Sequence, residues 1–190
     1  MGLVQVKPSP LFSRLYVSIA MSADYQFEAL APNHVEPLLQ FELQNRSWFE
    51  SLIEARPVSF YSIDAVADHI QQAIYMLKEG RGRSYVLCHS NNIIARANIK
   101  SIDNGRGEIG YRVAKSYTGQ GLASYCLECL LQVARKELGL ELLQAKVLEN
   151  NPASLHILQK QGFEIIEKTE NFLSLHGENL AVFGLQLRLK

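Results

Sequence analysis

The sequence predicts a mixed α+β domain in which a mostly antiparallel, twisted sheet carries helices on both faces. Three observations predict it. An apolar stripe with helical spacing runs through residues 63–78, and an alternating strand pattern follows around the turn Ser90-Asn91-Asn92. Residues 108–148 have the pattern of a strand, a glycine loop, a helix and a second strand. A chain of 190 residues without a repeat or linker is expected to form a single domain.

The N-terminal half is expected to contain two strands followed by three helices. Residues 14–19 and 25–30 alternate in the way that strands do. The expected helices span residues 34–44, 46–54 and 63–78. Asn33 has a suitable side chain to cap the first of them, and Gly80 and Gly82 end the third.

The second half is expected to contain most of the sheet. Its expected strands span residues 84–89, 93–102, 108–113, 142–148, 163–167 and 180–187. Helices over residues 122–138 and 152–161 separate some of them, and Gly139 and Gly162 follow these helices as stop signals.

Composition excludes several function classes. Nineteen basic and nineteen acidic side chains cancel, so no net field draws the chain to nucleic acid or to a membrane. No apolar run reaches the roughly 20 residues of a membrane span, and the N-terminus lacks the pattern of a signal peptide. We expect a cytoplasmic protein, monomeric or homodimeric, with no direct nucleic-acid or membrane partner.

The three cysteines, Cys88, Cys126 and Cys129, form no disulfide framework. Cys126 and Cys129 have the C-x-x-C spacing of some metal and redox sites. They lie in the apolar face of a predicted helix, however, and no second ligand pair accompanies them. We therefore expect two core side chains and no metal.

The segment Thr118-Gly119-Gln120-Gly121-Leu122-Ala123 is the part of the chain that predicts a ligand type. Gly119 and Gly121 can adopt positive φ and carry no Cβ. Bare N–H groups at a helix N-terminus bind anions, and this loop fits a pyrophosphate. The pattern is neither a P-loop nor a Rossmann loop, and two spaced glycines before a helix also occur in ordinary tight turns.

This loop resembles the coenzyme A loop of the GNAT superfamily of N-acetyltransferases, whose pattern is [Arg/Gln]-x-x-Gly-x-[Gly/Ala]. Gly121 and Ala123 match that pattern, while Thr118 replaces the Arg or Gln. A second block resembles the N-x-x-S…K-x-G-F signature of the RimJ/RimL-type branch; it consists of Asn151-Pro152-Ala153-Ser154 and Lys160-Gln161-Gly162-Phe163. That branch acetylates the N-terminal amino groups of ribosomal proteins and includes relatives with other amine substrates.

The resemblance implies the GNAT fold over residues 24–190, with residues 1–23 as a lead-in that matches poorly. It implies an enzyme that transfers the acetyl group of acetyl-coenzyme A to a primary amine. The implied cofactor-binding residues are Tyr111, Arg112, Val113, Thr118, Gly119, Gln120, Gly121, Leu122, Ala123, Asn151 and Ser154. The strand residues would align the pantetheine through their main chain, and the loop would hold the pyrophosphate.

Two side chains are expected to carry proton transfers. Glu108 is the candidate base, which would accept the amine proton directly or through water. An ordinary solvated glutamate at a strand end would give the same sequence pattern. Many superfamily members protonate the leaving thiolate with a tyrosine, but Leu158 occupies that position here. The resemblance therefore selects Ser154, which is otherwise an ordinary polar residue in the first turn of a helix. Trp48 is the candidate substrate-contacting residue, although aromatic residues are more often core.

The acceptor stays open at this point. The resemblance favours the N-terminal amino group of a protein, such as a ribosomal protein. The alternatives are a small amine, such as a polyamine, an aminoglycoside or an amino acid, and a non-catalytic coenzyme A-binding regulatory domain.

Overall fold

The computed structural model describes residues 25–175 and 177–189. The strand expected at residues 14–19 and the lead-in at residues 1–23 therefore lie outside the described residues. Within the described part of the chain, no helix is long and apolar enough to cross a membrane.

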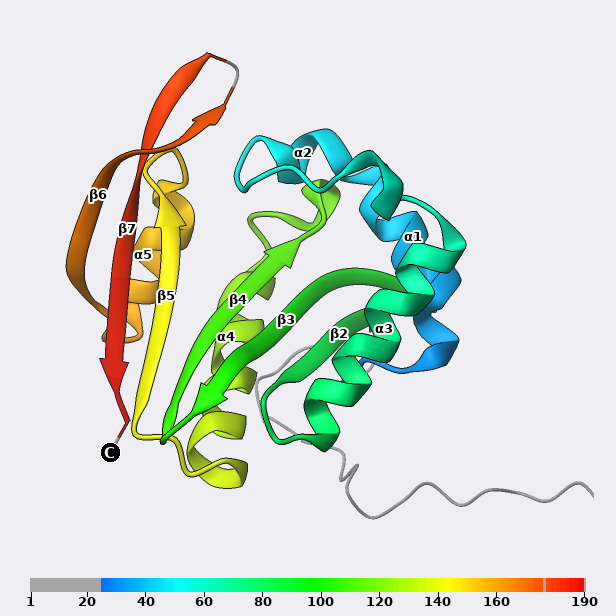
Figure 1. Cartoon of the computed structure of the whole chain (residues 1–190), viewed down its shortest axis with the longest axis horizontal. Coiled ribbons are helices and arrows are strands. Elements are labelled where there is room, and N and C mark those ends of the chain that lie inside the picture. The colour runs from blue at the N-terminus through cyan, green and yellow to red at the C-terminus, as the bar shows by residue number, and fades with distance from the viewer. Residues whose placement is uncertain (1–24, 176, 190) are drawn as a thin grey trace, which may run out of the picture.

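One seven-stranded sheet runs through the molecule in the order β1-β2-β3-β4-β5-β7-β6, as Figure 1 shows. The strands are β1 Tyr25–Ala29, β2 Arg83–His89, β3 Asn92–Asp103, β4 Arg106–Val113, β5 Leu142–Leu148, β6 Glu164–Leu175 and β7 Glu178–Arg188. β4 and β5 are parallel, and all other neighbours are antiparallel. The predicted fold class is confirmed: a mostly antiparallel sheet with helices in a single domain.

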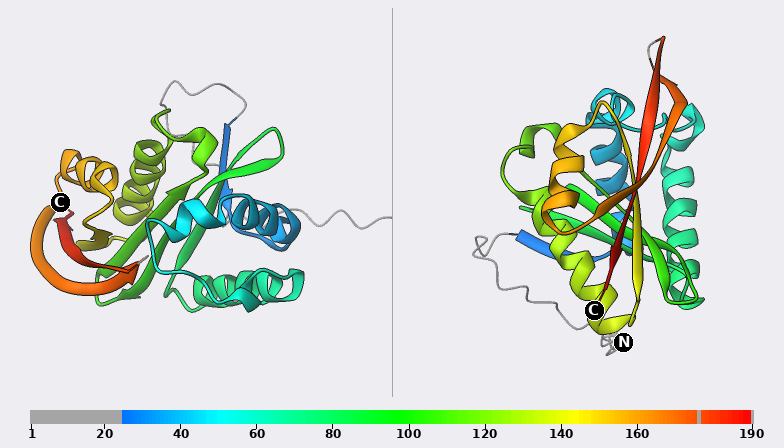
Figure 2. Two further views of the ribbon diagram at one scale, coloured as in Figure 1. Left: turned by 90° about the horizontal axis from the view of Figure 1, so that it is seen from above. Right: turned by 90° about the vertical axis from the view of Figure 1, so that its left-hand side faces the viewer.

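The helices cover both faces of the sheet. They are α1 Val35–Gln44, α2 Arg46–Glu50, α3 Ile63–Lys78, α4 Leu122–Gln132 and α5 Pro152–Lys160. α1, α2 and α3 lie on one face, and α4 and α5 lie on the other (Figure 2). Each face has its own apolar core, one under α1 and α3 and a larger one under α4 and α5.

Local sequence explains where α3 begins and which side chains α3 and α4 bury. α3 begins where the Ser62 hydroxyl accepts a hydrogen bond from the Ala65 N–H, 3.2 Å away, and its stripe buries Val66 and Ile70 completely. In α4, Cys126 and Cys129 are fully buried among Leu side chains. Burial raises the pKa of the Cys129 thiol to about 12, as expected for an unreactive core residue.

Several predicted boundaries differ from the observed ones. Asn33 does not cap α1, because residues 32–34 form a 3-10 turn and the helix begins at Val35. α2 ends at Glu50 rather than at residue 54. β6 was expected to stop at residue 167 but continues to Leu175, since pairing with β7 extends a strand whose own sequence is polar and exposed.

The feature that matters most for function is the separation of β4 from β5. These strands pair only from Arg106–Leu142 to Glu108–Gln144. The remainder of β4 therefore has β3 as a partner on one edge and no strand on the other edge. Unpaired N–H and C=O groups on that edge can accept an extended ligand as an added strand.

Candidate active site

A cavity of about 310 Å³ opens where β4 separates from β5. Its walls come from α2, β4, the loop before α4 and the start of α5. The lining residues are Trp48, Phe49, Leu52, Ile53, Tyr111, Arg112, Val113, Tyr117, Thr118, Gly119, Gly121, Leu122, Ala123, Ser124, Asn151, Ala153, Ser154 and Ile157. All the expected cofactor-binding residues except Gln120 therefore lie around one space, although they come from segments 40 residues apart in sequence.

The glycine loop has the conformation that an anion nest requires. Gly119 and Gly121 have φ values of 74° and 78°, and Gly121 is the N-cap of α4. A Cβ added at either glycine would have no heavy atom within 4 Å, so space lies above both. Among the described residues, none accepts a hydrogen bond from the backbone N–H groups of Gly119, Gln120 or Gly121. The loop thus offers unsatisfied donors and a helix dipole to an anion.

The polar side chains of the loop point away from this nest. The Thr118 hydroxyl donates to the Lys115 carbonyl at 2.8 Å, and the Gln120 amide donates to the Ser116 carbonyl at 3.3 Å. Both bonds fix the loop against the turn before it. The main chain, not these side chains, is therefore the part that can meet a pyrophosphate.

The first turn of α5 brings Ser154 against β4. The Asn151 side chain accepts a hydrogen bond from the Ser154 N–H at 3.1 Å and so caps the helix, with Pro152 at its first position. The Ser154 hydroxyl lies 3.0 Å from the Tyr111 hydroxyl. Burial raises the pKa of Tyr111 above its ordinary value, so this phenol stays protonated and can donate to Ser154.

The tyrosine side chain was missed from the sequence, which assigned only main-chain contacts to Tyr111. One signal was available, because Tyr111 stands two residues from both Ile109 and Val113 and therefore lies on their buried face of β4. The other missed residues are the apolar wall of α2 and the loop that follows it: Phe49, Leu52 and Ile53.

Trp48 lies in the cavity wall, and its place is fixed by β4. Its indole N–H donates to the Val113 carbonyl at 3.2 Å. This bond ties α2 to the end of the strand that precedes the glycine loop. Trp48 therefore shapes the entrance from the α2 side.

Glu108 does not line the cavity. Its carboxylate lies 2.8 Å from the Lys100 ammonium on the neighbouring strand β3. The structure therefore does not bring together the two residues expected to move protons. Among the described residues that line the cavity, Arg112 is the single one with a charged side chain.

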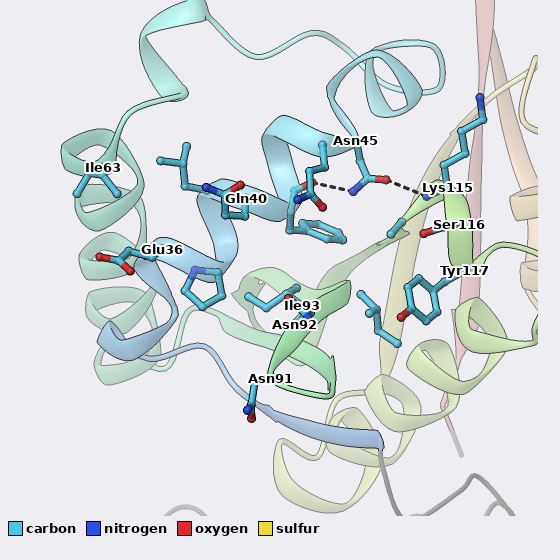
Figure 3. A pocket seen from close by; sticks show the side chains of 16 residues that line it. Glu36, Gln40, Asn45, Ile63, Asn91, Asn92, Ile93, Lys115, Ser116 and Tyr117 are labelled. Atoms are coloured by element: carbon cyan, nitrogen blue, oxygen red, sulfur yellow. Dashed lines mark hydrogen bonds between the residues drawn. The ribbon is translucent and has the colours of Figure 1, made fainter.

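A larger groove of about 1010 Å³ lies beside the site, between α1 and the β2–β3 turn (Figure 3). Asn45 links its two sides, because its amide donates to the Phe41 carbonyl at 2.8 Å and accepts from the Lys115 N–H at 2.9 Å. This buried bridge holds the 3-10 turn Lys115–Tyr117, from which the glycine loop starts. The groove therefore adjoins the loop but contains none of the expected site residues.

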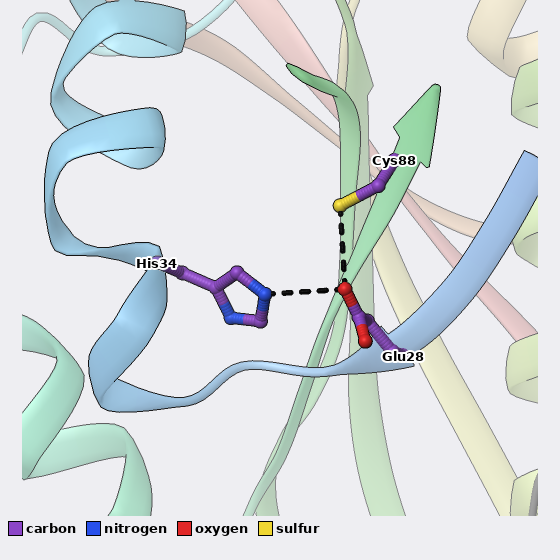
Figure 4. A group of neighbouring side chains, drawn as sticks. All are labelled: Glu28, His34 and Cys88. Atoms are coloured by element: carbon purple, nitrogen blue, oxygen red, sulfur yellow. Dashed lines mark hydrogen bonds and ion pairs between the residues drawn. The ribbon is translucent and has the colours of Figure 1, made fainter. Parts of the chain in front are cut away.

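Glu28 on β1, His34 in the 3-10 turn that follows it and Cys88 on β2 form a separate cluster (Figure 4). The His34 Nδ1 atom accepts a hydrogen bond from the Ala31 N–H at 2.9 Å, so the neutral ring carries its proton on Nε2. That proton points at Glu28, 3.2 Å away, and Glu28 also accepts from the Cys88 thiol at 3.5 Å. A metal ion binds a histidine nitrogen through its lone pair, and the protonated Nε2 has no free lone pair. The hydrogen bonds therefore explain why these three side chains lie together.

The sequence is similar to those of known acetyltransferases. The family model described as "Acetyltransferase (GNAT) domain" matches residues 26–164. The ribosomal-protein-serine acetyltransferase of Escherichia coli (strain K12) is 25% identical over 148 residues, which cover 77% of this chain and 82% of that protein. A probable N-acetyltransferase of Bacillus subtilis (strain 168), YjcK, is 23% identical over 133 residues, which cover 67% of this chain and 74% of that protein.

Solved structures show the same fold. A RimL ribosomal L7/L12 alpha-N-protein acetyltransferase in complex with coenzyme A superposes with a TM-score of 0.80 at 22% identity, covering 88% of this chain and 96% of that one. The ribosomal-protein-S5-alanine acetyltransferase of Vibrio fischeri gives a TM-score of 0.81 at 17% identity, with coverage of 87% and 93%.

Proposed function

The chain belongs to the GNAT acetyltransferase family, and from this premise we propose that it acetylates the N-terminal amino group of a protein, such as a ribosomal protein. As a member of the family it is an acetyltransferase that uses acetyl-coenzyme A. The roles proposed for individual residues rest on one observation. The glycine loop, the unpaired edge of β4 and Ser154 all lie around one cavity.

Amine chemistry, together with the names of the similar proteins, supports an α-amino group as the acceptor. The amine must be neutral to attack, and no carboxylate is found among the described residues that line the cavity. An α-amino group has a pKa of about 7.7–8.0, whereas a lysine side chain has a pKa of about 10.4. An N-terminal amine is therefore substantially neutral near pH 8 without a base from the protein, and solvent can accept the proton that it releases.

We propose that this chain binds the cofactor mainly through its main chain. The N–H groups of residues 119–123 hold the pyrophosphate, and the edge of β4 at residues 111–113 bonds to the pantetheine as an added strand. Asn151, which lines the same cavity, contacts the pantetheine. Acetyl-coenzyme A supplies a thioester, whose carbonyl carbon the amine attacks.

Ser154 protonates the leaving group in this proposal, and its hydrogen bond with Tyr111 supports that role. When the carbon–sulfur bond breaks, the Ser154 hydroxyl donates its proton to the thiolate and recovers one from the Tyr111 hydroxyl, 3.0 Å away. The phenol is then reprotonated from solvent, so the proton lost by the amine and the proton gained by sulfur balance. A backbone N–H of β4 stabilises the oxyanion that forms at the carbonyl.

We propose residues 24–190 as the acetyltransferase domain. The protein would act in the cytoplasm, where a ribosomal protein would be its acceptor. Trp48, which lies on α2 and lines the cavity, contacts the acceptor in this proposal.

The acceptor assignment is tested by initial rates with acetyl-coenzyme A as the donor. The panel contains peptides with an unblocked N-terminus, the same peptides with a blocked N-terminus but an unmodified lysine, spermidine and an aminoglycoside. We expect only the unblocked peptides to be acetylated at rates above the buffer reaction. Faster acetylation of spermidine or the aminoglycoside would contradict the proposal and assign a small-amine substrate.

A further inference from the structure

A buried group of ionic side chains lies behind the α2 wall of the cavity. Its centre is Glu42 on α1, whose side chain is 1% exposed. Arg112 on β4 donates to Glu42 at 2.6 Å, and Arg96 on β3 donates to it at 3.3 Å. Arg56, which follows α2, lies 3.9 Å from the second oxygen of the same carboxylate.

The group contains more positive than negative charge. Three guanidinium groups face one carboxylate. The neighbouring His69 adds no negative charge and is itself neutral, because its Nε2 accepts a hydrogen bond from Arg96 at 2.9 Å. Burial, and then the charge of Arg96, lower the pKa of His69 to about 3. The next ion pair, Arg46 with Glu50, is neutral as a unit. An excess of two positive charges therefore remains.

This excess is costly in a buried place unless an anion balances it. Burial, and then the charge of Arg96, lower the pKa of Arg112 to about 9, which reflects that cost. The Arg56 Nε atom is buried, and no described residue accepts a hydrogen bond from it. The guanidinium groups thus have donor capacity that Glu42 does not use.

The side chains of Arg112 and Arg56 are more exposed than that of Arg96, at 14% and 28% against 6%. Arg112 lines the cavity, with its guanidinium 5.0 Å from the ring of Phe49. The Arg56 side chain is 28% exposed and stacks 4.0 Å from the ring of Phe60. Arg96, by contrast, is buried, and its contact with Glu42 helps to hold that carboxylate in place.

We propose that Arg112 and Arg56 form a subsite for a carboxylate of the acceptor, so that the enzyme prefers N-terminal peptides with Asp or Glu at the first or second position. The proposal rests on the proposed function, because it concerns the acceptor of that reaction. An incoming carboxylate would accept bidentate hydrogen bonds from guanidinium groups that are already ordered by Glu42 and by aromatic rings.

The test compares kcat/KM for two peptides that differ only by Asp or Asn at the second position. Wild type is expected to favour the acidic peptide by about tenfold, which corresponds to one charge-assisted contact. Arg56→Gln is expected to reduce that ratio to near one, and Arg56→Lys is expected to retain part of it. Arg135→Gln is the matched control, since Arg135 is exposed in the π-helical segment after α4 and its replacement makes the same change in net charge. It should keep the wild-type ratio.

The carboxylate subsite and N-terminal acetylation are contradicted by different results. Equal kcat/KM for both peptides in wild type, or a ratio that Arg56→Gln leaves intact, would overturn the carboxylate subsite and leave N-terminal acetylation standing. Absence of acetylation of either peptide would overturn both. Free aspartate is included as a third acceptor, and its acetylation in preference to the acidic peptide would assign the subsite to amino acids rather than to proteins.

Discussion

Gly121→Trp is expected to abolish acetyl-coenzyme A binding while leaving the protein folded. Gly121 has a φ of 78° and is the N-cap of α4, with open space where a Cβ would be. A tryptophan would fill that space and deny the pyrophosphate at least two N–H donors, each worth about 1.5–3 kcal/mol toward a charged group. We therefore expect Kd to rise by more than about 100-fold in calorimetric titration.

Folding should survive because the strain is small compared with total stability. A non-glycine residue in the left-handed region costs about 1–2 kcal/mol, against an overall stability of about 5–15 kcal/mol. Gly80→Trp is the matched control: Gly80 has a φ of 71°, no atom within 4 Å of an added Cβ, and a position at the end of α3. This control should show the same loss in Tm but wild-type binding. Equal binding by both variants would remove the loop from the cofactor site.

Ser154→Ala is expected to lower kcat by about 100-fold, which is the lower range for loss of a proton donor in the transition state. The KM for acetyl-coenzyme A should change by less than about fivefold, since a neutral hydrogen bond contributes about 1 kcal/mol net. Tyr111→Phe should act in the same direction but less strongly, because the phenol acts through Ser154.

Two variants check the specificity of that result. His156→Ala changes an exposed residue on the same helix and should leave kcat unaltered. Glu108→Gln should keep the wild-type pH–rate profile, because its carboxylate pairs with Lys100 outside the cavity. A profile displaced to higher pH would return Glu108 to the mechanism as the base, and an unchanged kcat in Ser154→Ala would remove Ser154 from it.

Elements encoded by local sequence were predictable to the residue. α3 has a serine cap, a continuous apolar stripe and a glycine stop, and its observed bounds match the prediction. β5 alternates buried apolar residues with the exposed Gln144 and Lys146, and its bounds also match. The glycine loop was predictable for the same reason, because its backbone conformation depends on the glycines themselves.

Contacts between distant segments were not predictable. Tyr111 and Ser154 are 43 residues apart, and no local pattern relates them. Glu42 looks like an ordinary surface acid of an amphipathic helix. A signal for its partners was present, however, since Arg96 interrupts the buried apolar run of β3 and proves to be paired directly with Arg112 on β4. Charged residues inside buried strands required a partner that only the fold could identify.

Amide hydrogen exchange with and without saturating acetyl-coenzyme A shows where the cofactor binds. We expect slower exchange for the N–H groups of Gly119, Gln120 and Gly121 and along the unpaired edge of β4. The groove between α1 and the β2–β3 turn should be unaffected. Protection confined to that groove, with the glycine loop unchanged, would mean that the cofactor does not bind at the glycine loop.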